Sequence, residues 1–202
     1  MMNQWVVGCH ETRDAAIIDA GGDPQLFVDF CEREGLRVTK ILQTHGHVDH
    51  VASLAETKEA TGAEVYFHPL AEPVAARAPS RAAMYGFKCS QPPEADRHLA
   101  NGGSVEVGKI RFDVWHTPGH APGHVCFVSA ENNVAFGGDL LFKGSVGRTD
   151  LPGCDPAKMG PSLSRLFTLG DDTIVYAGHM EPTTIGYERV TNPFLDTFEV
   201  VR

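Results

Sequence analysis

Residues 44–50, Thr44-His45-Gly46-His47-Val48-Asp49-His50, decide the fold that we expect for this chain. Four potential metal ligands occupy six positions directly after a β-rich segment. On an extended backbone alternate side chains share a face, so His45, His47 and Asp49 would lie on one side and His50 on the other. Imidazoles and carboxylates are ligands that zinc, iron and manganese accept. The segment therefore predicts ligands for two adjacent ions.

Three further potential ligands follow predicted strands in the same manner. His120 lies within Thr-Pro-Gly-His-Ala-Pro-Gly-His at 117–124, Asp139 follows two glycines, and His179 follows one. A glycine beside each ligand lets the backbone turn sharply and approach an ion closely. A single histidine is more often a surface or hydrogen-bonded residue. Four such segments together favour a metal site.

Short apolar runs alternate with amphipathic stretches along the chain. The patterns predict strands over 15–18, 38–42, 64–67, 104–107, 110–116, 124–129, 133–136 and 173–176, and helices over 24–35, 51–61 and 157–169. Residues 68–103 are irregular and rich in proline, which is typical of either a lid over a site or a surface excursion. Neither GxGxxG nor GxxxxGK[ST] occurs. The expected class is α/β without a nucleotide-binding signature.

Composition limits the classes of partner. The 202 residues include 17 basic and 26 acidic side chains, a formal net charge of −9, which argues against nucleic acid and anionic membranes. No apolar run approaches the ~20 residues of a membrane span. The five cysteines are widely spaced without CxxC, and no secretory signal is visible. We therefore expect reduced thiols and a cytoplasmic protein.

Taken together, these motifs resemble the metallo-β-lactamase superfamily, whose fold is an αββα sandwich with its metal site at one edge. The resemblance runs from about Asp19 to the C-terminus and is strongest to the glyoxalase II-like hydroxyacylglutathione hydrolases, especially their single-domain branch. It is carried by residues 117–124, 138–142, 147–153, 184–189 and 192–195. The resemblance implies one domain over residues 1–202, without the C-terminal helical domain that grips glutathione in full-length glyoxalase II.

The resemblance also implies a ligand set and a reaction. His45, His47 and His120 would hold one divalent ion, and Asp49, His50 and His179 a second, with Asp139 bridging the two. Zinc, iron and manganese all suit these donors. Two such ions share a water and lower its pKa, which gives a hydroxide that Asp49 and Asp139 orient. The implied reaction is hydrolysis of S-lactoylglutathione to lactate and glutathione.

An acylglutathione is anionic, so local cations are needed for its recognition. Lys143 and Arg148 follow Asp139 and are the candidates, with solvated surface charge as the other interpretation of each. Tyr187 is a further candidate for the pocket wall. His124 is expected to hydrogen-bond near the metal site rather than to bind an ion.

Other readings stay open. A persulfide dioxygenase of the same fold uses one iron, held by the equivalents of His45, His120 and Asp139. A lactonase, a β-lactamase and a metal-stabilised binding module are further alternatives. The family usually opens with an extra strand, but eighteen residues precede Asp19. Either that strand is shortened, which leaves an edge for a second copy in a homodimer, or translation starts upstream of Met1.

Overall fold

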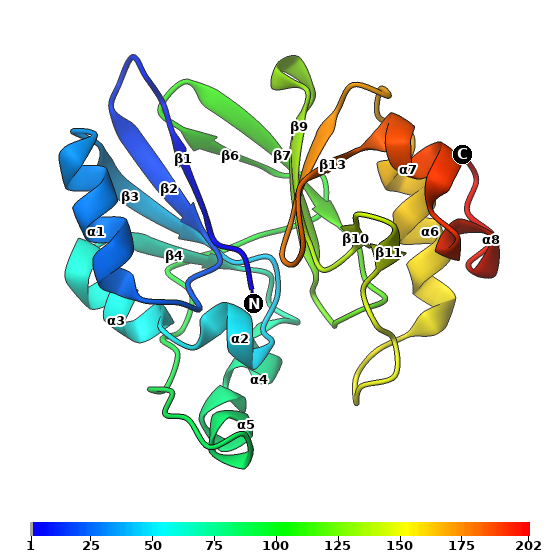
Figure 1. Cartoon of the computed structure of the whole chain (residues 1–202). Coiled ribbons are helices and arrows are strands. Elements are labelled where there is room, and N and C mark those ends of the chain that lie inside the picture. The colour runs from blue at the N-terminus through cyan, green and yellow to red at the C-terminus, as the bar shows by residue number, and fades with distance from the viewer. Residues whose placement is uncertain (1) are drawn as a thin grey trace.

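Two β-sheets pack face to face, and helices cover the outer face of each (Figure 1). The computed structural model describes residues 2–202. The first sheet has the order β1 (Trp5–Gly8), β2 (Asp14–Ile18), β3 (Arg37–Leu42), β4 (Glu64–Phe67) and β5 (Arg97–His98). The second has the order β13 (Thr183–Thr184), β12 (Ile174–Ala177), β9 (Val134–Gly138), β8 (Val125–Ser129), β7 (Ile110–His116) and β6 (Ser104–Val107). This is the expected αββα sandwich.

Helices flank both sheets. The part of the chain that forms the first sheet also contains α1 (Pro24–Arg33), α2 (Val48–Val51), α3 (Leu54–Thr61), α4 (Glu72–Ala75) and α5 (Ala78–Met84). The second is accompanied by α6 (Pro156–Leu166), α7 (Ile185–Thr191) and α8 (Phe194–Thr197), the 3₁₀ turn Ala130–Asn132, and a hairpin of β10 (Leu141–Phe142) and β11 (Ser145–Val146). Every helix within residues 2–202 is too short or too polar to span a bilayer.

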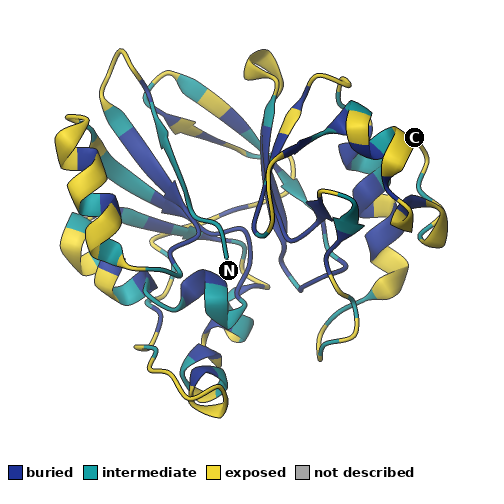
Figure 2. Cartoon of the chain, in the orientation of Figure 1, coloured by how far each residue is buried: buried dark blue, intermediate teal, exposed yellow. Residues whose placement is uncertain are grey.

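Alternation along the strands builds the core in layers. In β2 and β3, Ile18 and Leu42 pack toward the second sheet, whereas Ile17 and Ile41 join the cluster that includes Phe27 of α1. Successive side chains of a strand point to opposite faces, so one strand serves both layers. The second sheet shares its outer layer with buried side chains of α6 in the same way. Figure 2 shows the buried strands between exposed helix faces.

Several local features differ from the sequence predictions. In the second half of the chain β10, β11, β13, α7 and α8 are absent from the predicted set, and three further differences lie in the first half. Strand β1 is absent from the predicted set, because its four residues are all half-buried and give no strong pattern. The predicted helix 51–61 starts earlier and is divided into α2 and α3, since the Ser53 amide donates to the carbonyl of Ala20 at the break. The irregular stretch 68–103 contains α4, α5 and β5.

One glycine of α6 generates a stability prediction. A Cβ at Gly160 would lie 2.1 Å from the carbonyl oxygen of Phe198, which follows α8. Glycine to alanine normally stabilises a helix by about 1 kcal/mol. Here the clash must displace the C-terminal segment, so we expect Gly160→Ala to lower the free energy of unfolding by about 1–3 kcal/mol in urea denaturation.

The matched control is Lys158→Ala, an exposed position of the same helix whose ion pair with Asp155 contributes about 0–1 kcal/mol. A Gly160→Ala protein more stable than the wild type would contradict the close approach of the two segments.

Candidate metal centre

Strand register gathers the site at one edge of the sandwich. Ile18 pairs with Leu42 where β2 and β3 end side by side, and Ala177 pairs with Gly138 where β12 and β9 end. Both pairs are parallel, so the loops that follow these four strands leave the same edge of each sheet. All the predicted ligands except His120 lie on these loops or on the short helix α2. His120 comes from the turn between β7 and β8.

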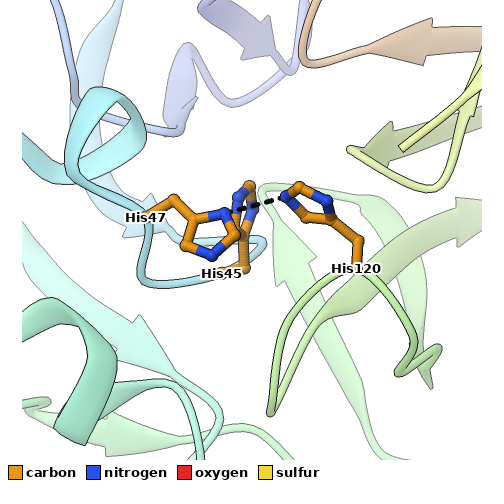
Figure 3. Close-up of side chains that lie close together, drawn as sticks. All are labelled: His45, His47 and His120. Atoms are coloured by element: carbon orange, nitrogen blue, oxygen red, sulfur yellow. Dashed lines mark hydrogen bonds between the residues drawn. The ribbon is translucent and has the colours of Figure 1, made fainter. Parts of the chain in front are cut away.

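Three histidines form a first group of ligand atoms. One ring nitrogen from each of His45, His47 and His120 lies within 4.8 Å of the others. Figure 3 shows the rings converging, with His47 Nδ1 and His120 Nε2 facing each other 2.8 Å apart. His120 Nδ1 donates to the Arg148 carbonyl oxygen at 2.8 Å, which leaves the Nε2 lone pair directed into the group. The His45 Nε2 atom is buried and has no hydrogen-bond partner.

The buried carboxylate of Asp19 orients two of the histidines. Its Oδ1 accepts from the Thr44 amide at 2.7 Å, and its Oδ2 accepts from the Thr44 hydroxyl at 2.7 Å and from His50 Nδ1 at 2.9 Å. Because the Thr44 hydroxyl donates to Asp19, it accepts from His45 Nδ1, 3.0 Å away. Both imidazoles therefore carry a proton on Nδ1 and turn Nε2 toward the site.

A second group lies on the more open side of the first. The ligand atoms of Asp49, His50 and His179 also lie within 4.8 Å of one another. Asp49 Oδ2 is 3.2 Å from His179 Nε2 and 3.8 Å from His50 Nε2. The side chain of His50 is fully buried, whereas that of Asp49 is 46% exposed. The second group is therefore the one that solvent reaches more easily.

Asp139 lies between the two groups. Its Oδ2 is 3.4 Å from His120 Nε2 and 3.5 Å from His179 Nε2, and its Oδ1 is 3.3 Å from His50 Nε2. Oδ1 and His50 Nε2 are both buried without a hydrogen-bond partner. Buried polar atoms without partners are costly, and here the two lie 3.3 Å from one another. This donor set fits bound cations.

Burial and neighbouring charges separate the pKa values of these groups. Burial lowers the pKa of His45 well below its ordinary value and that of His47 to about 4. Burial alone would lower the pKa of His50, but the carboxylates of Asp139 and Asp19 raise it well above the ordinary value. Burial alone would also raise the pKa of the Asp139 carboxyl, which adjacent histidines, His50 foremost, hold below its usual range. His45 and His47 are therefore neutral imidazoles close to an ionised Asp139 carboxylate, as metal binding requires, whereas His50 must release a proton to bind a cation.

Two neighbours fix the position of Asp139. His124 is fully buried and accepts from the Asp139 amide through Nε2 at 3.0 Å, while its Nδ1 donates to the Thr117 hydroxyl. Burial lowers the pKa of His124 to about 3, so the ring is neutral. On the other side a Cβ at Gly178 would lie 2.2 Å from Asp139 Oδ1, which requires glycine there. His124 therefore contacts the site through the backbone of Asp139.

A cavity of about 660 Å³ opens over both groups and is lined by His47, Asp49, His120, Asp139 and His179 among others. Arg148 also lines it, and its guanidinium donates to Asp150 at 2.6 and 2.7 Å. Lys143 Nζ donates to Glu181 at 2.6 Å, and Tyr187 lies half exposed on α7. Neither of these two side chains is part of the cavity wall.

Asp19 is the functional residue that the sequence analysis missed. It directly follows the strand predicted over 15–18, in the segment Asp19-Ala20-Gly21-Gly22, and the sequence pattern assigns it no role at the site. Asp19 has a backbone φ of 60°, a conformation that aspartate tolerates better than most residues. The available signal was an acidic residue directly after a buried strand, the same placement that identified Asp139.

Comparisons with known proteins agree with this geometry. Residues 2–179 match the family model of the metallo-beta-lactamase superfamily. The hydroxyacylglutathione hydrolase GloC of Haemophilus influenzae is 36% identical over 190 residues, which are 93% of this chain and 90% of that protein.

Two solved structures share the fold at the same TM-score of 0.88. TTHA1623, solved in a di-iron-bound form, is 42% identical, with 96% of this chain and 95% of that chain covered. The B3 metallo-beta-lactamase BLEG-1 is 35% identical, with 96% and 94% covered.

The contacts of Asp19 predict a role in metal affinity. Asp19→Asn replaces the charged acceptor of His50 Nδ1 by a neutral one, so Nε2 becomes a weaker donor to a cation. We expect the affinity for Zn²⁺, measured by competition with a chelator, to fall about 10–100-fold. Asp14→Asn, at the other end of β2 in an exposed ion pair with Arg37, is the control and should leave the affinity unchanged. Equal affinities for all three proteins would argue against this orienting role.

Proposed function

This chain belongs to the metallo-beta-lactamase superfamily, and we propose that within it the protein is a dinuclear hydrolase of glutathione thioesters. The proposed reaction converts S-lactoylglutathione to lactate and glutathione. The similarity to the hydrolase GloC supports this substrate class. The similarity to TTHA1623, which binds two irons, supports two ions.

The observation that carries the proposal is the position of Asp139 between two groups of ligand atoms. His45, His47 and His120 would hold one ion, Asp49, His50 and His179 the other, and Asp139 both. A single-iron dioxygenase needs two histidines and one carboxylate, which the first group and Asp139 already provide. The additional group Asp49, His50 and His179 would supply the ligands for the second ion that a dinuclear hydrolase requires.

The bound ions, whether zinc, iron or manganese, would lower the pKa of a water and stabilise negative charge on the carbonyl oxygen of the substrate. The chain supplies the orientation. Asp49 lines the cavity and its exposed carboxylate can accept a proton from the attacking water, while Asp139 fixes the separation of the two groups. The leaving thiol has a pKa of about 8.5 and departs as a thiolate without a strong general acid.

Arg148 is the proposed substrate contact nearest the reaction, because it lines the cavity beside His120 and Asp139. Its bidentate contact with Asp150 fixes the position of the guanidinium group that would contact the substrate. Lys143 and Tyr187 lie outside the cavity wall and belong to the proposal as outer contacts. For Lys143 the support is its partner Glu181, which follows the proposed ligand His179 by two residues.

Activity and metal content test the proposal together. Protein purified without added metal is expected to contain about two ions per chain and to hydrolyse S-lactoylglutathione. Asp139→Asn removes the charge shared by both groups, so we expect a loss of more than about 100-fold in kcat/KM, beyond what residues behind the ligands typically cost. Asp113→Asn, an exposed partner of Arg111 on β7, should retain wild-type activity.

Other outcomes identify the alternatives. Oxygen uptake with glutathione persulfide, one iron per chain and an intact thioester would replace the proposal by a persulfide dioxygenase. Hydrolysis of a lactone or a β-lactam with no hydrolysis of the thioester would move the protein to another branch of the superfamily. Full activity of Asp139→Asn in every assay would contradict an enzymatic role for the centre.

A further inference from the structure

One wall of the cavity carries two arginines on a single helical face. Arg77 directly precedes α5 and Arg81 lies within it, four residues later, so their side chains project from the same side of the helix. Tyr85 follows at the same spacing. All three line the cavity that contains the metal ligands. In Figure 1 this helix lies below the first sheet, across from the loop that contains residues 147–153.

Neither guanidinium group has a partner among the described residues 2–202. The chain has eleven arginines, and within residues 2–202 nine of them donate a hydrogen bond to a side chain or a carbonyl oxygen. Arg77 and Arg81 are the two in that range whose guanidinium groups make no hydrogen bond, ion pair or ring contact. By contrast, Arg148 is already held by Asp150. In a chain of net charge −9, two unpaired guanidinium groups therefore face one cavity.

The same wall is apolar between the charges. Leu70, Tyr85 and Phe87 line the cavity with exposed fractions of 55%, 69% and 42%. Large apolar side chains gathered at this exposure are typical of a binding surface. The wall therefore suits an extended ligand that has both aliphatic segments and anionic ends.

In the proposed substrate, only the glutathione half has both aliphatic segments and anionic ends. The lactoyl group is small and uncharged, and its carbonyl must reach the metal ligands. The glutathione half carries the carboxylates and must extend from that point along the cavity. A guanidinium binds a carboxylate with two parallel hydrogen bonds, which favours arginine for this task.

We propose that Arg77 and Arg81 bind the carboxylates of the thiol half of the substrate, so that α5 selects thioesters of an anionic peptide thiol. The inference rests on the proposed thioester hydrolysis and adds to it the part of the substrate that is recognised. The arginines act on binding, because they lie at the start of α5 and within it and not among the proposed metal ligands.

The test compares two lactoyl thioesters with the double variant Arg77→Gln/Arg81→Gln. For S-lactoylglutathione we expect KM to rise about tenfold per arginine, about 100-fold in total, with kcat within threefold of wild type. For S-lactoyl-N-acetylcysteamine, whose thiol half is uncharged, kcat/KM should stay within twofold. Lys88→Gln is the matched control, since this cation follows α5 and lies outside the cavity wall.

A second readout does not depend on turnover. Calorimetric titration of the metal-loaded protein with S-methylglutathione, a thioether that cannot be hydrolysed, should show binding that weakens with added salt. The double variant should bind at least tenfold more weakly, and Lys88→Gln should bind as the wild type does. Circular dichroism of the double variant confirms that its fold is retained.

The two proposals fail in different ways. Suppose that the wild type hydrolyses both thioesters. If the double variant then keeps the wild-type affinity and KM, or loses activity equally on both thioesters, the role of α5 is wrong and the hydrolase proposal stands. If the wild type hydrolyses neither thioester, the hydrolase proposal is wrong. In that case, the arginine assignment is also wrong if S-methylglutathione does not bind to the wild type, or if it binds to the double variant as tightly as to the wild type.

Discussion

His50 lies between two buried carboxylates, and this arrangement joins the ends of the two sheets. Its Nδ1 contacts Asp19 Oδ2 at 2.9 Å and its Nε2 lies 3.3 Å from Asp139 Oδ1. Two carboxylates buried this close to each other are unstable unless cationic groups or hydrogen bonds compensate them. Asp19 follows β2 and Asp139 follows β9, so the balance of charge at the site depends on how the two sheets pack. A Cβ added at Gly178 would overlap Asp139, so the two sheets have little room to pack in another way.

Charge is distributed unevenly between the whole chain and its cavity. The net charge of −9 repels anions at long range, yet Arg77, Arg81 and Arg148 all line the cavity. Two of the acidic groups, Asp49 and Asp139, face histidines and the proposed ions, so they contribute less to the field that a ligand meets. The residues that line the cavity therefore carry more positive charge than the composition of the whole chain suggests.

The sequence predicted the parts of this protein that depend on local pattern. The spacing of His45 and His47 and the strand ends before Asp139 and His179 are such local patterns, and the structure brings these side chains to one site. The extended backbone assumed for Asp49 and His50 was wrong, since α2 begins at Val48 and a helical turn, not strand alternation, sets their directions. Asp19 was missed because its role depends on a neighbouring strand. Arg77 and Arg81 carry no local signal, because a charged helix face over a cavity has the same sequence as one in solvent.

The distances along the chain between the ligands bear on the order in which this protein folds. His47 and His120, which face each other, are 73 residues apart in sequence, whereas Asp19 and His50 are separated by 31. A folding intermediate with only the first sheet formed would contain Asp19 and His50 but neither His120 nor His179 in place. Contacts between such distant segments form late, since closing a long loop must precede them. The proposed ligands are therefore complete only when the two sheets have packed, so tight metal capture would depend on that packing.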